Sequence, residues 1–198
     1  MNAHRTIAWP YHHKVACRRA GGFTLIEAAL ATVIVGTGVL AIVAAQQAYH
    51  QKNDWAARTG TAMLLANEIR ELTLSMRHHD PITGASVLGP EANEFMGDDF
   101  DPTLFDDLDD FAGNMIGSQG EGTRINPPIN ALRKQIVGMD NWTQFVTVES
   151  VLPEDISTVF AQPLGSTDMM RVSVAVRYSN PGTSQTNTIT TLTWVVPE

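Results

Sequence analysis

An uncharged stretch near the N-terminus limits how this chain can fold. Residues 28–45 are 18 consecutive residues without a charge, and residues 23–26 extend the apolar run on its N-terminal side. A helix of roughly 20 apolar residues spans the hydrocarbon core of a bilayer. The sequence therefore predicts a chain that crosses a membrane once.

The charges around this stretch predict its orientation. Residues 1–22 contain four basic residues and no acid, so the formal charge of −8 leaves −12 for residues 23–198. Basic residues before the apolar stretch favour a cytoplasmic N-terminus and an extracytoplasmic C-terminal part. The acidic remainder lacks the clustered Lys and Arg that phosphate contacts need, so we expect no nucleic-acid partner.

Length and composition indicate one modest folded domain plus an appendage. A chain of 198 residues with 43% hydrophobic and 17% charged residues is typical of a folded protein. The single cysteine, Cys17, precedes the apolar stretch. A chain trimmed after it has no disulfide, so its fold depends on its core and its partners.

Two common kinds of N-terminal processing fit the sequence poorly. Val43-Ala44-Ala45 offers small residues for an ordinary signal peptidase. However, Glu27 lies within the apolar region, and a carboxylate in hydrocarbon costs about 2.5–3.5 kcal/mol on insertion scales. A lipoprotein signal at Cys17 has the wrong order, because its apolar stretch follows the cysteine.

The segment from Arg18 to Glu27, Arg-Arg-Ala-Gly-Gly-Phe-Thr-Leu-Ile-Glu, resembles the class III signal of type IV pilins and pseudopilins. The resemblance covers about residues 18–48. It implies that a prepilin peptidase cuts after Gly22 and methylates the new N-terminus of Phe23. It also implies that Glu27 pairs with the N-terminal amine of a neighbouring subunit during filament assembly.

The physical reason for such a pairing is that a buried carboxylate needs a partner. The simpler alternative is that Glu27 reaches the lipid headgroups from an ordinary membrane anchor.

A helix of residues 23–78 is predicted, with residues 23–48 as the membrane-spanning or filament-core part. No proline occurs between Phe23 and Asp80, and His78-His79-Asp80-Pro81 is typical of a helix end rather than of a zinc site. Beyond the span, side chains at helical spacing form a stripe that can cover a sheet. They are Trp55, Thr59, Ala62, Met63, Ala66, Ile69, Leu72 and Met76.

Residues 80–130 are rich in Gly, Pro, Asn and Asp and are interpreted as a connecting region with at most short helical turns. The aspartates include Asp106, Asp107, Asp109 and Asp110. These four could bind calcium, which takes carboxylate oxygens, although no EF-hand spacing is present. Because charge runs usually remain in water, a solvated acidic loop is the favoured interpretation. No other cofactor is expected.

The C-terminal part, residues 140–198, changes to a period of two. Strands are predicted over about 142–151, 170–178 and 187–196, with a turn at 179–182. The predicted fold is α+β: a long N-terminal helix packed on a small antiparallel sheet, within a globular part of residues 79–198.

We expect a structural subunit rather than an enzyme, because no catalytic motif is present in the sequence. The resemblance implies a minor pilin or minor pseudopilin of a type IV pilus or type II secretion-like filament. Its partners would be a prepilin peptidase, other pilin subunits, an assembly platform in the bacterial inner membrane, and lipid before assembly. The alternative is a single-pass membrane-anchored binding domain that does not polymerise.

Overall fold

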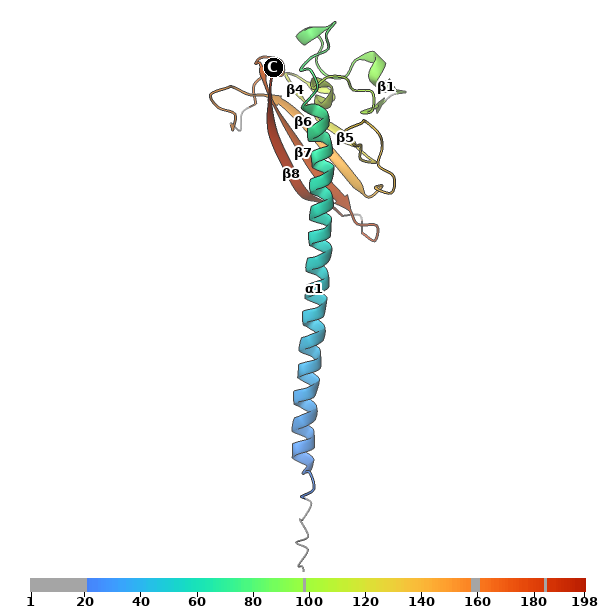
Figure 1. Cartoon of the computed structure of the whole chain (residues 1–198), viewed down its shortest axis with the longest axis vertical. Helices are drawn as coiled ribbons and strands as arrows, with labels where there is room; N and C mark the ends of the chain where they lie inside the picture. Colours follow the sequence, from blue (N-terminus) through green and yellow to red (C-terminus); the bar gives the residue numbers. More distant parts are fainter. Residues whose placement is uncertain (1–20, 98, 158–160, 184) are drawn as a thin grey trace, which may run out of the picture. The chain divides into compact units, whose positions relative to one another are not determined.

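The computed structural model describes residues 21–97, 99–157, 161–183 and 185–198. Most of the basic leader, including Cys17, Arg18 and Arg19, lies outside these residues. The chain forms two compact units, residues 1–50 and 51–198. Helix α1, Leu25–Thr73, is the long helix, and the strands belong to the second unit (Figure 1).

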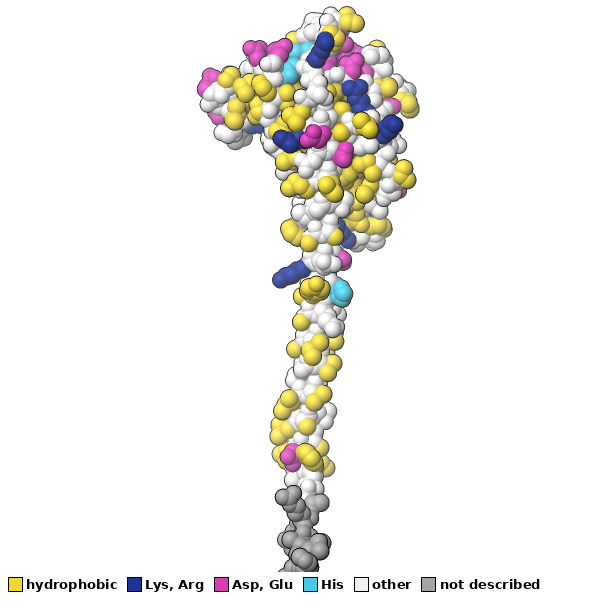
Figure 2. All heavy atoms as spheres, viewed as in Figure 1, with side chains coloured by type: hydrophobic (Ala, Val, Ile, Leu, Met, Phe, Trp, Pro, Cys, Tyr) yellow, Lys and Arg dark blue, Asp and Glu magenta, His cyan; other side chains and the backbone are white. Residues whose placement is uncertain are grey.

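The part of α1 within the first unit is apolar on every side. Val33, Ile34 and Val35 differ by about 100° around the helix axis, yet all three are more than 60% exposed. Figure 2 shows apolar side chains spread along the visible length of this part of the helix. Among the described residues, α1 is long and apolar enough to cross a membrane by length and composition. Such a helix requires lipid or other protein around it.

The second unit contains a four-stranded antiparallel sheet in the order β5-β6-β7-β8. Its strands are β5 Thr123–Ile125, β6 Trp142–Ser150, β7 Met169–Ser179 and β8 Thr186–Pro197. The three longer strands and the β7–β8 hairpin confirm the α+β prediction. Strand β5 was not predicted, because three residues are too few to show alternation.

One face of the sheet packs with the second half of α1 to form the core. Val146 of β6 lies opposite Val174 of β7, which lies opposite Leu192 of β8. The helix residues buried in this core are Ala62, Leu65, Ala66, Ile69 and Leu72. The predicted stripe therefore starts too early, since Trp55 is 63% exposed. It also contains Met63, which is 44% exposed, and omits the buried Leu65.

Helix α1 ends at Thr73 rather than at residue 78. The Thr73 hydroxyl donates to the Ile69 carbonyl, and a turn follows. The next backbone groups bond to a distant segment, since Arg77 O accepts from Leu108 N and His78 O accepts from Asp109 N. Tertiary hydrogen bonds thus replace the last predicted helical turn.

The region between α1 and β5 has more structure than predicted. It contains the short 3₁₀ helices η1 Gly84–Ser86, η2 Ala92–Glu94 and η3 Asp109–Ala112. It also contains two small antiparallel hairpins, formed by β1 Phe95–Met96 with β2 Asp99–Phe100 and by β3 Met115–Ile116 with β4 Gln119–Gly120.

Candidate functional sites

The predicted processing residues lie directly before helix α1. Gly22 and Phe23 are exposed, and among the residues described from 21 onward none beyond its chain neighbours would meet a Cβ placed on Gly22. Thr24 then caps the helix, because its Oγ1 accepts the backbone N–H of Glu27 at 3.3 Å. The segment that a peptidase would have to reach thus lies outside α1, before its first turn.

Glu27 lies in the first turn of α1, where a carboxylate interacts favourably with the helix dipole. Thr24 and Glu27 have the Thr-x-x-Glu spacing of a helix start, a signal that the sequence interpretation missed. The sequence has no Lys or Arg from Phe23 to Gln51. Glu27 therefore has no basic side chain of its own helix within several turns.

The four predicted metal ligands do not form a solvated loop. Asp107, Asp109 and Asp110 are at most 2% exposed, and only Asp106 is exposed. These three aspartates are buried because the apolar residues beside them, Phe105, Leu108 and Phe111, are fully buried in the core. Phe111 lies in the 3₁₀ helix η3, and Phe105 and Leu108 precede it in the chain. Burial of these three side chains carries the adjacent aspartates inward.

Asp107 and Asp110 are each held through one oxygen. Asp110 Oδ2 accepts the backbone N–H groups of Asp106 and Asp107 at 3.0 and 3.1 Å. Asp107 Oδ1 accepts those of Asp109 and Asp110 at 3.1 and 3.3 Å. Among the described residues, Asp107 Oδ2 and Asp110 Oδ1 are buried without any hydrogen-bond donor.

Two glutamates that the sequence interpretation did not single out join these aspartates. One oxygen each from Glu91, Asp107 and Asp110 lie within 4.8 Å of one another, and the same holds for Glu94, Asp106 and Asp110. We call these five residues the acidic cluster. Glu94 also accepts the backbone N–H groups of Glu91 and Asp106 at 2.9 and 3.2 Å.

Asp109 points to a different partner. Its Oδ2 lies 3.2 Å from His79 Nδ1 and accepts the Gly89 backbone N–H at 3.3 Å. The ring of His78 is perpendicular to that of His79, with centroids 6.4 Å apart. Among the described residues, neither histidine belongs to a group of three or more possible ligands close enough to share a metal ion.

Burial determines the electrostatics of this region. It raises the pKa values of Asp107, Asp109 and Asp110 above the ordinary range of a carboxyl group, since removal from water disfavours the charged form. Burial lowers the pKa of His78 for the same reason. The ion pairs found among the described residues involve none of the five carboxylates of the acidic cluster.

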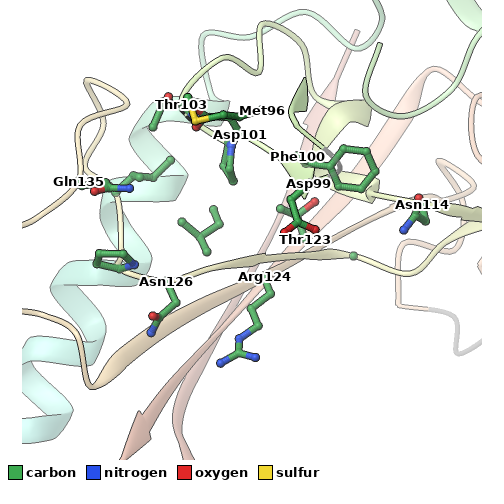
Figure 3. A pocket seen from close by; sticks show the side chains of 15 residues that line it. Met96, Asp99, Phe100, Asp101, Thr103, Asn114, Thr123, Arg124, Asn126 and Gln135 are labelled. Carbon is green, nitrogen blue, oxygen red and sulfur yellow. Dashed lines mark hydrogen bonds between the residues drawn. The ribbon is translucent and has the colours of Figure 1, made fainter. Parts of the chain in front are cut away.

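A separate cavity of about 630 Å³ lies between the segment 96–103 and strand β5. Asp99 and Asp101 line it, and Asp101 Oδ1 accepts both the backbone N–H and the hydroxyl of Thr103. Figure 3 shows the Arg124 side chain extending away from these two aspartates. Its lining contains neither histidine nor cysteine, and its charged groups do not converge.

Comparison of the chain with protein-family models, with curated proteins and with solved structures found no match.

Proposed function

Because a long apolar N-terminal helix packed on an antiparallel sheet is the arrangement of pilin-like proteins, we propose that this chain is a structural subunit of a type IV pilus or type II secretion-like filament. The subunit is of the minor pilin or minor pseudopilin type. A prepilin peptidase cuts it after Gly22 and methylates Phe23. The subunit itself catalyses no reaction.

The observation that carries this proposal is Glu27, a charged residue in a helix segment that is apolar on all sides. A segment with no polar face must be surrounded completely, either by lipid or by the same segments of other subunits. In lipid alone the carboxylate is costly, whereas a neighbouring subunit can offer a cation. Cleavage after Gly22 would create such a cation, the amine of Phe23, in a segment that otherwise has no Lys or Arg.

The charge distribution predicts where the subunit lies before it is assembled into a filament. With the basic leader retained in the cytoplasm, the helix crosses the bacterial inner membrane and the sheet lies on its outer side. Assembly then requires a platform protein in that membrane and other pilin subunits that contact residues 23–48.

The experiment is to determine the N-terminus of the mature protein. The full chain is produced in a bacterium with and without a prepilin peptidase, purified from membranes, and characterised by intact mass and N-terminal peptide mass spectrometry. We expect a product that begins at N-methyl-Phe23 only when the peptidase is present.

The two adjacent glycines provide a matched control. Within the part of the chain that the structure describes, neither Gly21 nor Gly22 would bring a Cβ within 4 Å of another residue beyond its chain neighbours. Neither substitution should therefore disturb the fold. Gly22→Val should block cleavage because it replaces the residue after which the peptidase cuts, whereas Gly21→Val should leave the cleavage position unchanged. A mature protein that retains Arg18 and Arg19 in the presence of the peptidase would instead support a membrane-anchored binding domain.

A further inference from the structure

We propose that the cavity between the segment 96–103 and strand β5 is a binding site for a neutral oligosaccharide. This inference concerns the folded second unit and goes beyond the role in a filament. It does not depend on cleavage at Gly22 or on assembly, because all residues that line the cavity lie between Met96 and Gln135.

The cavity has the size and the layout of a ligand site. Its volume of about 630 Å³ lies within the range of roughly 300–1,000 Å³ that small-molecule sites occupy. In Figure 3 the labelled side chains form a row, with Gln135 near one end, Asn114 at the other, and Asp101 and Asp99 between them. Such a row suits an elongated ligand with several polar groups.

The wall formed by the segment 96–103 is held in place before any ligand binds. Phe100 lies opposite Phe95 in the β1–β2 hairpin, and the two rings meet edge to face with centroids 4.7 Å apart. The backbone N–H of Asp101 donates to the Glu94 carbonyl oxygen at 2.9 Å. The other wall, β5, is paired with β6. A site that is formed in advance requires little reorganisation when it binds.

The cavity contains polar side chains that the fold does not use. Among the described residues, the side chains of Asp99, Asn114 and Gln135 take part in no hydrogen bond. An amide side chain both donates and accepts, and a carboxylate accepts through two oxygens. Adjacent hydroxyl groups on a sugar ring donate and accept in the same way. These side chains are therefore suited to a ligand rich in hydroxyl groups.

Phe100 supplies the apolar surface that a sugar ring also needs. The residue lines the cavity and is partly exposed. One face of a pyranose ring presents C–H groups, which pack on the electron-rich face of an aromatic ring. Asp99 and Asp101 flank Phe100 in the sequence, so an aromatic ring and two hydrogen-bond acceptors border the same cavity.

The charged groups favour an uncharged ligand. The charged residues in the lining are Asp99, Asp101 and Arg124, and Figure 3 shows Arg124 extending away from the two aspartates. An anion would need basic groups that converge on it. Neither aspartate belongs to a group of three possible metal ligands within the described part of the chain. The lining thus offers hydrogen bonds without a paired set of charges.

The edge of β5 is too short to bind an extended peptide through its backbone. Strand β5, Thr123–Ile125, lies at the edge of the sheet but has only three residues. Pro127 follows shortly after it and has no N–H to donate. Strand addition depends on a row of main-chain hydrogen bonds, which this edge cannot supply. Recognition by side chains therefore fits the cavity better.

The test is titration of the full chain with cellotriose, maltotriose and chitotriose by isothermal titration calorimetry. The detergent is lauryldimethylamine oxide, because a detergent with a sugar headgroup would compete for the site. We expect saturable binding of at least one trisaccharide with a Kd of roughly 10⁻⁵ to 10⁻³ M. Tri-lysine, titrated at an ionic strength of about 0.15 M to screen exposed charges, should show no saturable binding in this range.

The informative variant is Asp99→Ala. Asp99 is exposed and its side chain makes no hydrogen bond to other described residues, so the fold should be unchanged. We expect trisaccharide binding to weaken by about tenfold, the effect of losing a hydrogen bond to a charged group. The matched control is Asp54→Ala, which removes an exposed aspartate of α1 outside the cavity and should bind as the native chain does.

Phe100→Leu is the second variant. It keeps an apolar side chain beside Phe95 but removes the aromatic face, and it should weaken binding by roughly fivefold. Circular dichroism shows whether each variant is folded, and Phe100→Leu decides if Asp99→Ala is not. Absence of saturable binding of all three trisaccharides at millimolar concentrations would overturn the proposal. Equal binding by the native chain and folded Asp99→Ala, or binding of tri-lysine as tight as that of the sugars, would also overturn it.

Discussion

Gln144, the third residue of strand β6, donates a hydrogen bond from Nε2 to the Leu65 carbonyl oxygen of helix α1 at 2.8 Å. The same side chain donates to the Ile129 carbonyl at 3.0 Å and accepts the Ile129 N–H at 2.9 Å. Gln144 is fully buried on the core face of the sheet, between apolar neighbours. One polar side chain thus connects the helix, the sheet and the loop before β6.

Gln144→Ala should lower the free energy of unfolding by about 2–4 kcal/mol, because it leaves buried backbone groups of Ile129 unpaired and creates a cavity. Thermal or denaturant unfolding of the full chain in detergent, followed by circular dichroism, measures the change. Gln135→Ala removes an exposed glutamine as the control and should be nearly neutral. Equal stabilities of the two variants would show that these hydrogen bonds contribute little.

Gly120 allows β4 to pass close to the turn that carries the buried aspartates. A Cβ at this position would lie 2.5 Å from Ala112 Cβ and closer still to the Ala112 carbonyl oxygen. Gly120→Ala should therefore destabilise the fold by about 1–3 kcal/mol through overpacking. Gly182→Ala, where nothing lies within 4 Å, is the control in the same unfolding assay. An unchanged melting curve for Gly120→Ala would show that η3 shifts freely.

Arg58 contacts the end of the sheet. Its guanidinium carbon lies 4.4 Å from the centre of the Tyr178 ring, which packs against Trp142 with centroids 4.9 Å apart. Arg58→Ala should reduce stability by about 0.5–1 kcal/mol, the usual range for a partly exposed cation–π pair. Arg124→Ala, which removes an exposed arginine, should have a smaller effect in the same assay. A loss of several kcal/mol at Arg58 would mean that the residue has a larger role than this pair.

Glu27→Gln tests the charge at the start of the helix. Gln can still take the N3 position after the Thr24 cap, so helix formation and cleavage after Gly22 should continue. Incorporation into filaments, measured in sheared fibre fractions, should fall on the order of tenfold or more, because the neutral side chain no longer pairs with the Phe23 amine.

The control for this effect is Asp54→Asn, which removes an exposed charge from the same helix beyond the apolar segment. It should leave incorporation unchanged. Native levels of Glu27→Gln in fibres would contradict a pairing role for the carboxylate.

The long helix and the three longer strands follow from periodicity, because the repeat of apolar residues changes from 3.6 to two between the helix and the C-terminal part. Periodicity could not predict that the residues of the acidic cluster lie together. Glu91 lies 16 residues before Asp107, and no local repeat relates them. The spacing of Phe105, Leu108 and Phe111 was an available signal for a buried turn. The aspartates at the intervening positions led instead to the interpretation of a solvated loop.

The sequence by itself determined the features that depend on local hydrophobic pattern and charge: an apolar helix with Glu27 near its start, a helical stripe and an alternating sheet. The tertiary structure alone decided where α1 ends, which helix residues are buried, and which carboxylates meet. The physical reason is that burial depends on the whole core. Phe105, Leu108 and Phe111 bring charged neighbours inside, and the Arg77 and His78 carbonyls accept hydrogen bonds from a segment about 30 residues further along the chain.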